Sequence, residues 1–243
     1  MPVVAISCGF KSHLLHYMRK TGWGFPLLCY NEVMRMNVLE LKNVYFRQGN
    51  FVLKNINFKL KDGELVVLKG KSGSGKSALI ELIGNAKQID AGKILYFNKE
   101  MYEDESGIRR RLSVVYDDIN FNEEMTGKKI IREIHKYEPF FSVEDCLKRF
   151  KDFGINSDMK VRMLSADMKK KLLVIIAISR NPDILVMDEP TKGLDEESRN
   201  EIWNMIFDYK INHDLSILFS SHHEHEMELL ADRVVWMENG GIR

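Results

Sequence analysis

The sequence predicts an α/β protein with a mostly parallel sheet, helices on both faces, an antiparallel β subdomain and a small helical subdomain. Three observations support this fold class. In the last third of the chain, short apolar runs typical of buried strands alternate with helical segments. A glycine-rich segment lies between one such run and a helix. Before that segment, near alternation of apolar residues predicts further strands.

The composition is that of an ordinary globular chain. Of its 243 residues 44% are hydrophobic and 29% are charged, and the formal net charge is +1. This balance does not indicate nucleic-acid binding, so we expect no nucleic-acid partner. No apolar stretch reaches the roughly 18 residues of a membrane span, and none follows a basic segment as in a secretory signal. Cys8, Cys29 and Cys146 lie far apart, which predicts reduced thiols in a cytosolic compartment.

The first 35 residues differ from the rest, and we interpret them as an extension of unknown role. His13 and His16 lie three positions apart in a short helical pattern there, but a pair without a third ligand does not predict a metal site. Strand patterns begin at residue 38. They are expected over 38–41 and 44–46, over 51–53 and 56–60, and at 65–68, 94–97 and 112–116, with a helix at 79–84.

The middle of the chain, about 126–162, predicts two helices separated by Glu138-Pro139. The basic run at 109–111, just before it, is interpreted as a solvated face. Beyond the middle, strands are expected at 184–187, 216–219 and 234–237, and an amphipathic helix at 196–209. Because strands and helices alternate here, these strands should join one mostly parallel sheet.

Residues 70–77 read G-K-S-G-S-G-K-S, which matches the phosphate-binding loop (P-loop) pattern G-x-x-x-x-G-K-S. Glycines let the backbone wrap closely enough for its N–H groups to converge on phosphate oxygens. Lys76 is suited to reach the outer phosphates, and the Ser77 hydroxyl to bind Mg²⁺. The helix that follows attracts anions at its N-terminus. We therefore predict a P-loop NTPase core, with a nucleotide bound by Gly70, Lys71, Ser72, Gly73, Ser74, Gly75, Lys76 and Ser77.

Two carboxylates, Asp188 and Glu189, end the apolar strand at 184–187. This position places them at the sheet edge where ligands of open α/β folds bind. Asp188 is suited to bind Mg²⁺, usually through water, and Glu189 to polarise the water that attacks the γ-phosphate. The alternative interpretation is that the two carboxylates only begin a helix and have no catalytic role. Pro190 directly after the pair, and the Gly-Leu-Asp segment at 193–195, argue against it.

A histidine follows the strand at 216–219. His222 is suited to hydrogen-bond the γ-phosphate or to orient the attacking water. His222, His223 and His225 are alternatively a metal cluster, but no cysteine lies nearby and the three would straddle a strand–helix junction. We therefore predict Lys76, Glu189 and His222 as the catalytic residues.

In order along the chain, these residues resemble the ATP-binding cassette (ABC) family over about residues 36–243. Residues 164–168, Leu-Ser-Ala-Asp-Met, stand where the family has its L-S-G-G-Q signature. The carboxylate-ending strand, the segment at 193–195 and His222 follow at the family's distances. Within the family, the chain is similar to bacterial exporter cassettes of the peptide and drug-resistance kind.

The resemblance implies how the protein works. Two cassettes pair head to tail, and each ATP lies between the phosphate loop of one and the signature of the other, so Ser165 would contact the nucleotide of its partner. Closure around ATP and opening after hydrolysis drive a coupled partner. The implied cofactors are ATP and Mg²⁺. The implied partners are a second ABC ATPase subunit and an integral membrane transporter subunit that docks on the helices of 126–162.

The signature departs from the family's pattern in a way that bears on turnover. Ala166 and Asp167 replace the two glycines that let a backbone N–H approach the γ-phosphate of the opposite site. A carboxylate at Asp167 would direct negative charge at a triphosphate, a repulsion on the order of a kcal/mol in a partly dry interface. We therefore expect an ATPase that is slow because of the degenerate segment Ala166-Asp167-Met168.

Two other departures concern the cassette's own half of the site. Asp117 replaces the family's glutamine and is a candidate Mg²⁺ ligand beside Ser77 and Asp188. Gln48 stands where the family stacks an aromatic ring on adenine, and the nearby candidates for that contact are Tyr45, Phe46 and Phe51. The preferred interpretation of Tyr45 and Phe46 is that they belong to the sheet.

The expected organisation is an extension at 1–35 and an ABC ATPase domain at 36–243. In that domain, 36–116 and 164–243 form the catalytic core with the β subdomain, and 117–163 the helical subdomain. The expected function is an ATPase subunit that dimerises around ATP and powers a separate membrane-spanning subunit, through which it lies in the cytoplasm on the inner face of the cell membrane. The alternative is a weakly hydrolytic regulatory or non-transport cassette. A GTPase would need an N-K-x-D motif, and residues 98–101 lack its aspartate.

Overall fold

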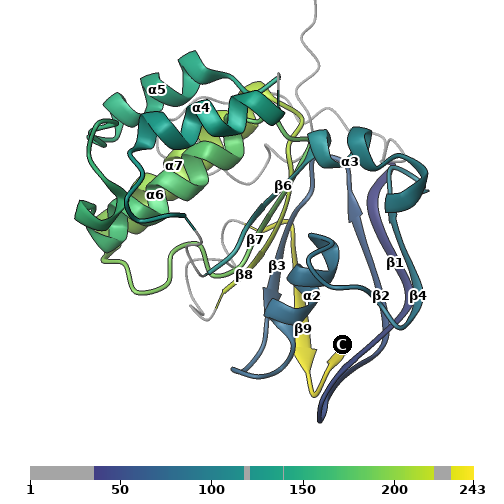
Figure 1. Cartoon of the computed structure of the whole chain (residues 1–243). Coiled ribbons are helices and arrows are strands. Elements are labelled where there is room, and N and C mark those ends of the chain that lie inside the picture. The colour runs from purple at the N-terminus through teal and green to yellow at the C-terminus, as the bar shows by residue number, and fades with distance from the viewer. Residues whose placement is uncertain (1–35, 118–120, 139, 222–230) are drawn as a thin grey trace, which may run out of the picture.

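The computed structural model describes residues 36–117, 121–138, 140–221 and 231–243. The predicted extension at 1–35 lies outside these ranges, and so do His222, His223 and His225. Within the described ranges, two sheets and the helices packed on them form the fold (Figure 1).

The central sheet has the strand order β10-β9-β3-β8-β7-β6. Neighbouring strands are parallel except β10, which is antiparallel to β9. Every residue of β3, β7 and β8 is buried, which explains their near-continuous apolar runs, because both faces of this sheet are covered. The strands are β3 (Leu65–Lys69), β6 (Leu112–Val115), β7 (Ile184–Met187), β8 (Ser216–Ser220), β9 (Arg233–Glu238) and β10 (Gly241–Ile242).

A second sheet, of order β2-β1-β4-β5, is antiparallel throughout. It consists of β1 (Asn37–Gln48), β2 (Phe51–Lys61), β4 (Ala91–Tyr96) and β5 (Lys99–Glu100). The strand patterns at 38–41 and 44–46 both belong to β1, which has a register shift between Leu41 and Val44. Asn43 has a φ of 48° in this irregularity. An irregularity of this kind breaks the alternation of side chains without ending the strand.

Helices cover both faces of the central sheet, as Figure 1 shows. Helix α2 (Lys76–Ile83) shares one hydrophobic core with the antiparallel sheet, and α6 (Ala166–Ile178) and α7 (Glu196–Asn212) share another on the opposite face. Successive residues of β3 alternate between the two cores: Leu65 and Val67 face one, and Val66 and Leu68 the other. The prediction of a mostly parallel sheet with helices on both faces is confirmed.

Two further helices, α4 (Gly127–Tyr137) and α5 (Val143–Asp152), join the core formed by α6 and α7. Each begins at a hydroxyl cap: Thr126 accepts a hydrogen bond from the Lys129 N–H at 3.3 Å, and Ser142 one from the Asp145 N–H at 3.3 Å. The two helices predicted over 126–162 are thus confirmed. The division of the chain at residues 117 and 163 stays a prediction.

The basic run at 109–111 lies in α3 (Glu105–Arg111), between the 3₁₀ turn η2 (Met101–Glu103) and β6. Arg109 and Arg110 are exposed, as expected. Arg111 departs from the expectation because it is half-buried: it pairs with Asp183 and lies 3.4 Å from the centroid of the Phe97 ring.

The helix predicted at 196–209 is three residues longer and begins at its cap Asp195, which accepts from the Ser198 N–H at 2.8 Å. A second 3₁₀ turn, η3 (Val161–Met163), precedes α6. In the part of the chain that the structure describes, no helix is long and apolar enough to cross a membrane.

Candidate active site

The loop at 70–77 leaves β3 and turns into α2. Gly70 has a φ of 155°, and a Cβ atom on it would lie 2.3 Å from the carbonyl oxygen of Met237. Gly75 has a φ of 113°, and a Cβ there would lie 2.8 Å from the Phe51 ring. Both positions require glycine, because a side chain would strain the backbone and collide with a neighbouring strand. The glycine pattern seen in the sequence is therefore a steric requirement of this turn.

The side chain of Lys76, the first residue of α2, folds back over the loop. Its Nζ donates to the carbonyl oxygens of Gly70 at 2.8 Å and Lys71 at 3.2 Å. Burial lowers the pKa of Lys76, although the negative charges of Glu189 and Asp188 act in the opposite direction. The ammonium group is thus held within the loop by weak acceptors that a phosphate oxygen can replace.

A cavity of about 300 Å³, here called the phosphate cavity, lies over the loop. Ser74 in the loop is buried, and its Oγ has no hydrogen-bond partner among the described residues. A buried hydroxyl without a partner costs free energy, but Ser74 is not among the residues that line the cavity. The residues lining the cavity are Phe51, Ser72, Gly73, Gly75, Lys76, Ser77, Ala78, Asp117, Glu189 and Lys192.

The two carboxylates directly after β7 are held in place by β8. The Oδ1 of Asp188 accepts from the Ser220 hydroxyl at 2.6 Å, and the backbone N–H of Glu189 donates to the same hydroxyl at 2.9 Å. Glu189 has a φ of 45°, a left-handed conformation uncommon for a non-glycine residue. The chain therefore turns sharply here, and Glu189 reaches the phosphate cavity. The sequence had not indicated Ser220 as a positioning residue.

Asp117, two residues beyond β6, lies between two lysines. Its Oδ1 accepts from Lys170 at 2.8 Å and its Oδ2 from Lys192 at 2.7 Å. Burial alone would raise the pKa of Asp117, but the hydrogen bonds from the two lysines outweigh burial and hold that pKa below its usual value. The Nζ of Lys192 also lies 3.6 Å from Oε2 of Glu189. Neither lysine was predicted from the sequence as a site residue. Only the position of Lys192, three residues after Glu189, could have indicated that it lies near the site.

The oxygen donors at this edge suit a magnesium ion. Ser77 lines the phosphate cavity, and Asp188 directly follows β7. The described residues contain no group of three or more His, Cys, Asp or Glu side chains that could hold a metal ion by themselves. Mg²⁺ would thus be held by these two side chains together with water and nucleotide phosphates, a ligand set that Mg²⁺ favours. Asp117 has a lysine on each carboxylate oxygen, and its role as a metal ligand stays a prediction.

The signature-like segment at 164–168 lies at the start of α6 and does not line the phosphate cavity. Ser165 caps the helix, accepting from the Met168 N–H at 3.4 Å, and donates its hydroxyl to the carboxylate of Asp167. This hydrogen bond lowers the pKa of Asp167, so the carboxylate is charged at neutral pH. The structure therefore does not bring Ser165 together with the loop residues of the same chain.

Of the three aromatic candidates for contact with a base, Phe51 lines the phosphate cavity. Phe46 is buried, with Lys87 at 5.8 Å from its ring centroid. Gln48 accepts a hydrogen bond from the same lysine at 2.9 Å. The geometry thus favours Phe51.

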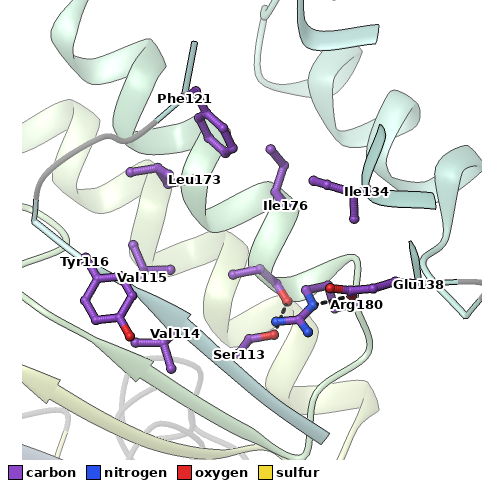
Figure 2. Close-up of a pocket in the computed structure, with 11 residues that line it drawn as sticks. Ser113, Val114, Val115, Tyr116, Phe121, Ile134, Glu138, Leu173, Ile176 and Arg180 are labelled. Atoms are coloured by element: carbon purple, nitrogen blue, oxygen red, sulfur yellow. Dashed lines mark hydrogen bonds and ion pairs between the residues drawn. The ribbon is translucent and has the colours of Figure 1, made fainter. Parts of the chain in front are cut away.

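A second cavity, of about 260 Å³, lies where α4 and α6 meet β6. Figure 2 shows apolar side chains from these elements pointing into it, with Arg180 and Glu138 at its edge. The Nε of Arg180 donates to Glu138 at 2.6 Å, and one terminal nitrogen donates to the Leu112 carbonyl at 3.2 Å. These contacts tie α4 and the end of α6 to the central sheet.

A larger cavity of about 600 Å³ adjoins it and shares Val114, Tyr116, Glu138 and Arg180 with it. The side chains of Tyr137 and Phe140 on its rim are 84% and 66% exposed, which is unusual for large aromatic groups. Arg110 lies 4.8 Å from the centroid of the Phe140 ring. We call this surface the arginine–aromatic groove; its defining residues are Arg109, Arg110, Tyr137, Phe140 and Arg180.

The sequence and the fold both have known relatives. A protein-family model described as ABC transporter matches residues 53–192, more than half of the chain. The ABC transporter ATP-binding protein YtrB of Bacillus subtilis (strain 168) is 27% identical over 196 residues, which cover 80% of this chain and 66% of YtrB. ATP-binding cassette sub-family A member 6 of Homo sapiens is 31% identical over 199 residues, which cover 79% of this chain and 12% of that protein. The chain thus spans less than two thirds of the length of these relatives.

A similar solved structure is described as the dimeric structure of a post-hydrolysis state of the ATP-binding cassette MJ0796 bound to ADP and Pi. Its TM-score is 0.73 at 23% identity, with 84% of this chain and 96% of that chain covered. At this identity the likeness shows a shared fold. The predicted P-loop NTPase fold class is confirmed.

Proposed function

Since this chain belongs to the ATP-binding cassette (ABC) family of ATPases, we propose that it binds and hydrolyses ATP in a dimer of cassettes and so powers a separate membrane-spanning transporter subunit. The observation that carries this proposal is the phosphate cavity, which has the loop's glycines and Lys76 on one side and Glu189 on the other. The groups proposed to bind phosphate and the group proposed to activate water thus line one cavity.

The loop at 70–77 is proposed to bind the phosphates of ATP. Its backbone N–H groups and the N-terminus of α2 attract phosphate oxygens. The ammonium group of Lys76 exchanges the carbonyl oxygens of Gly70 and Lys71 for the outer phosphates. Phe51 offers its ring to the base.

Hydrolysis is the task of the groups at the ends of β7 and β8. Glu189 takes a proton from the attacking water while the oxygen of that water bonds to the γ-phosphorus. The bond from that phosphorus to the bridging oxygen breaks, leaving ADP and phosphate. His222, beyond the described residues, is proposed to contact the γ-phosphate. When bound at Ser77 and Asp188, Mg²⁺ neutralises charge on the phosphate oxygens.

A second cassette completes each site. Ser165 is exposed at the N-terminus of α6, outside its own chain's phosphate cavity. A partner's triphosphate placed against this end meets the helix dipole and the serine hydroxyl. The relative MJ0796 is described as dimeric, which supports a pairing of this kind.

For the membrane subunit, we propose the arginine–aromatic groove as the docking surface. Exposed aromatic rings beside arginines are typical of protein interfaces. A cytoplasmic segment that carries apolar and acidic side chains fits this groove, because the rings offer apolar area and the arginines positive charge. Such a partner would hold this protein at the inner face of the cell membrane.

The alternative is a regulatory cassette with weak hydrolysis. The specific observation in its favour is the charged carboxylate of Asp167, which the hydrogen bond from Ser165 favours. In a homodimer this charge would face the triphosphate of each partner.

Substitution Glu189→Gln tests the proposal. Loss of the base should lower ATP turnover by about 100-fold or more, while ATP affinity is kept, so that ATP-bound dimers accumulate. Turnover is measured by phosphate release and dimerisation by light scattering with and without ATP. Glu133→Gln, a surface change on α4, is the matched control. Undiminished turnover in Glu189→Gln would remove Glu189 from this role, and wild-type protein that binds no ATP would end the proposal.

A further inference from the structure

Lys192 has no part in the mechanism above, yet it is a cationic group on the wall of the phosphate cavity. Its Nζ lies between the carboxylates of Asp117, at 2.7 Å, and Glu189, at 3.6 Å. We propose that Lys192 is a binding residue for the terminal phosphate: it leaves Asp117 when ATP enters and distinguishes a triphosphate from a diphosphate. This inference rests on the proposed function and goes beyond it, because it adds a cation that acts within one chain.

The position of Lys192 relative to Glu189 carries the first step. The water that Glu189 activates has to lie between its carboxylate and the γ-phosphorus. The ammonium group of Lys192 lies 3.6 Å from that carboxylate and lines the same cavity, so it is close to the place proposed for the water and the terminal phosphate. Lys76 approaches the same space from the loop, so two ammonium groups would flank the outer end of the nucleotide.

The two lysines on Asp117 differ in how exposed their side chains are. The Lys192 side chain is 56% exposed, whereas that of Lys170, the other lysine on Asp117, is 11% exposed. Lys170 is also fixed by the carbonyl oxygen of Glu189 at 3.4 Å. Lys170 thus suffices to neutralise Asp117, and the long, half-exposed side chain of Lys192 is free to reorient toward a stronger anion.

Among the described residues, the lysines and carboxylates around the phosphate cavity are equal in number. Three lysines, Lys76, Lys170 and Lys192, face three carboxylates, Asp117, Asp188 and Glu189, around this edge. A nucleotide adds several negative charges to a balanced site. Lys192 can move to the nucleotide at the least cost, because its partner Asp117 keeps its hydrogen bond from Lys170.

The first test is the affinity of Lys192→Met for ATP and for ADP, measured by calorimetry with and without Mg²⁺. The variant should lose about tenfold in ATP affinity, the effect of one charge-assisted contact, and less than twofold in ADP affinity. Lys192→Arg should keep most of the preference for ATP. Lys128→Met, which removes a surface lysine paired with Asp158, is the matched control. If Lys192 had a purely structural role, Lys192→Met would weaken the binding of ATP and of ADP equally. That result, or no change in either affinity, would overturn the proposal.

The second test removes the competitor for Lys192. In the absence of Mg²⁺, Asp117→Asn should raise ATP affinity severalfold, because Lys192 no longer has to leave a carboxylate. The gain should vanish in the double variant Asp117→Asn with Lys192→Met. Weaker ATP binding by Asp117→Asn without metal would contradict the exchange. If the wild-type protein binds neither nucleotide, the proposed function itself fails; if it binds ATP and Lys192→Met keeps the preference for ATP over ADP, only the role of Lys192 fails.

Discussion

Asp167, the second residue of α6, combines a local benefit with a cost at a distance. Its carboxylate lies in the first turn of the helix, where negative charge is favourable. It accepts the Ser165 hydroxyl, and Lys171 one turn later lies at 3.7 Å. Within one chain the residue is well placed. The cost arises only when a partner's triphosphate approaches the same helix end, because the two negative charges then repel.

We predict that Asp167→Gly raises the ATP turnover of the homodimer about fivefold, corresponding to a repulsion of about 1 kcal/mol. The measurement is phosphate release at saturating ATP. Asp167→Asn separates the two causes, since it removes the charge but keeps a side chain next to the helix N-terminus. Asp158→Asn, a surface change, is the control. Turnover that stays level or falls in both variants at position 167 would refute the repulsion.

At the scale of elements, the contact between α5 and α6 forms a closed apolar interior. Cys146 of α5 has no exposed surface and lies in the same core as Phe150 and Ile175. Burial raises the pKa of the Cys146 thiol from 9.0 to about 12. The folded protein therefore keeps the thiol proton where the unfolded chain has lost it.

This pKa predicts both reactivity and pH dependence. With Cys8 and Cys29 changed to Ser, Cys146 should resist alkylation at pH 8 in the native protein and react in denaturant. Above about pH 9 the unfolded chain binds fewer protons than the folded one, so the free energy of unfolding should fall, by at most about 1.4 kcal/mol per pH unit. Cys146→Ala should lack this contribution to the slope. Rapid native alkylation would show that α5 does not seal this core.

At the scale of the whole molecule, the arginine–aromatic groove, which we propose as the docking surface, lies close to the phosphate cavity along the chain. It lies next to β6, and Asp117 follows that strand by two residues. Tyr116, directly before Asp117, lines the groove. A segment that fills the groove, as proposed above, would therefore contact the chain directly before Asp117, which lines the phosphate cavity.

We predict that Arg110→Glu combined with Phe140→Ala abolishes attachment to native membranes and leaves ATP affinity within about twofold of wild type. The charge reversal repels an acidic partner segment, and the truncation removes exposed ring area. Attachment is measured by sedimentation with membranes from the native host. Arg243→Glu, also an exposed arginine, is the control. Undiminished attachment of the double variant, or equal loss in the control, would rule out the groove as the docking surface.

Local chain order was enough to predict the phosphate loop and the carboxylate pair. Residues 70–77 are contiguous, and their glycines are required by the turn itself. Asp188 and Glu189 end an apolar strand, so their place at the sheet edge follows from the pattern of a parallel sheet. The strand and helix alternation that predicts the fold class is likewise a property of consecutive residues.

Only the tertiary structure decided which distant side chains meet. Asp117 contacts Lys170 and Lys192 across 53 and 75 residues of sequence, and Ser220 reaches Asp188 across 32. Phe51 lines the phosphate cavity from a separate sheet. These contacts depend on how α6 and β8 pack against β6 and β7, and packing follows from the volumes of two whole cores. The sequence thus determined the phosphate-binding loop and the carboxylates at the sheet edge, and the folded packing decided which charges surround them.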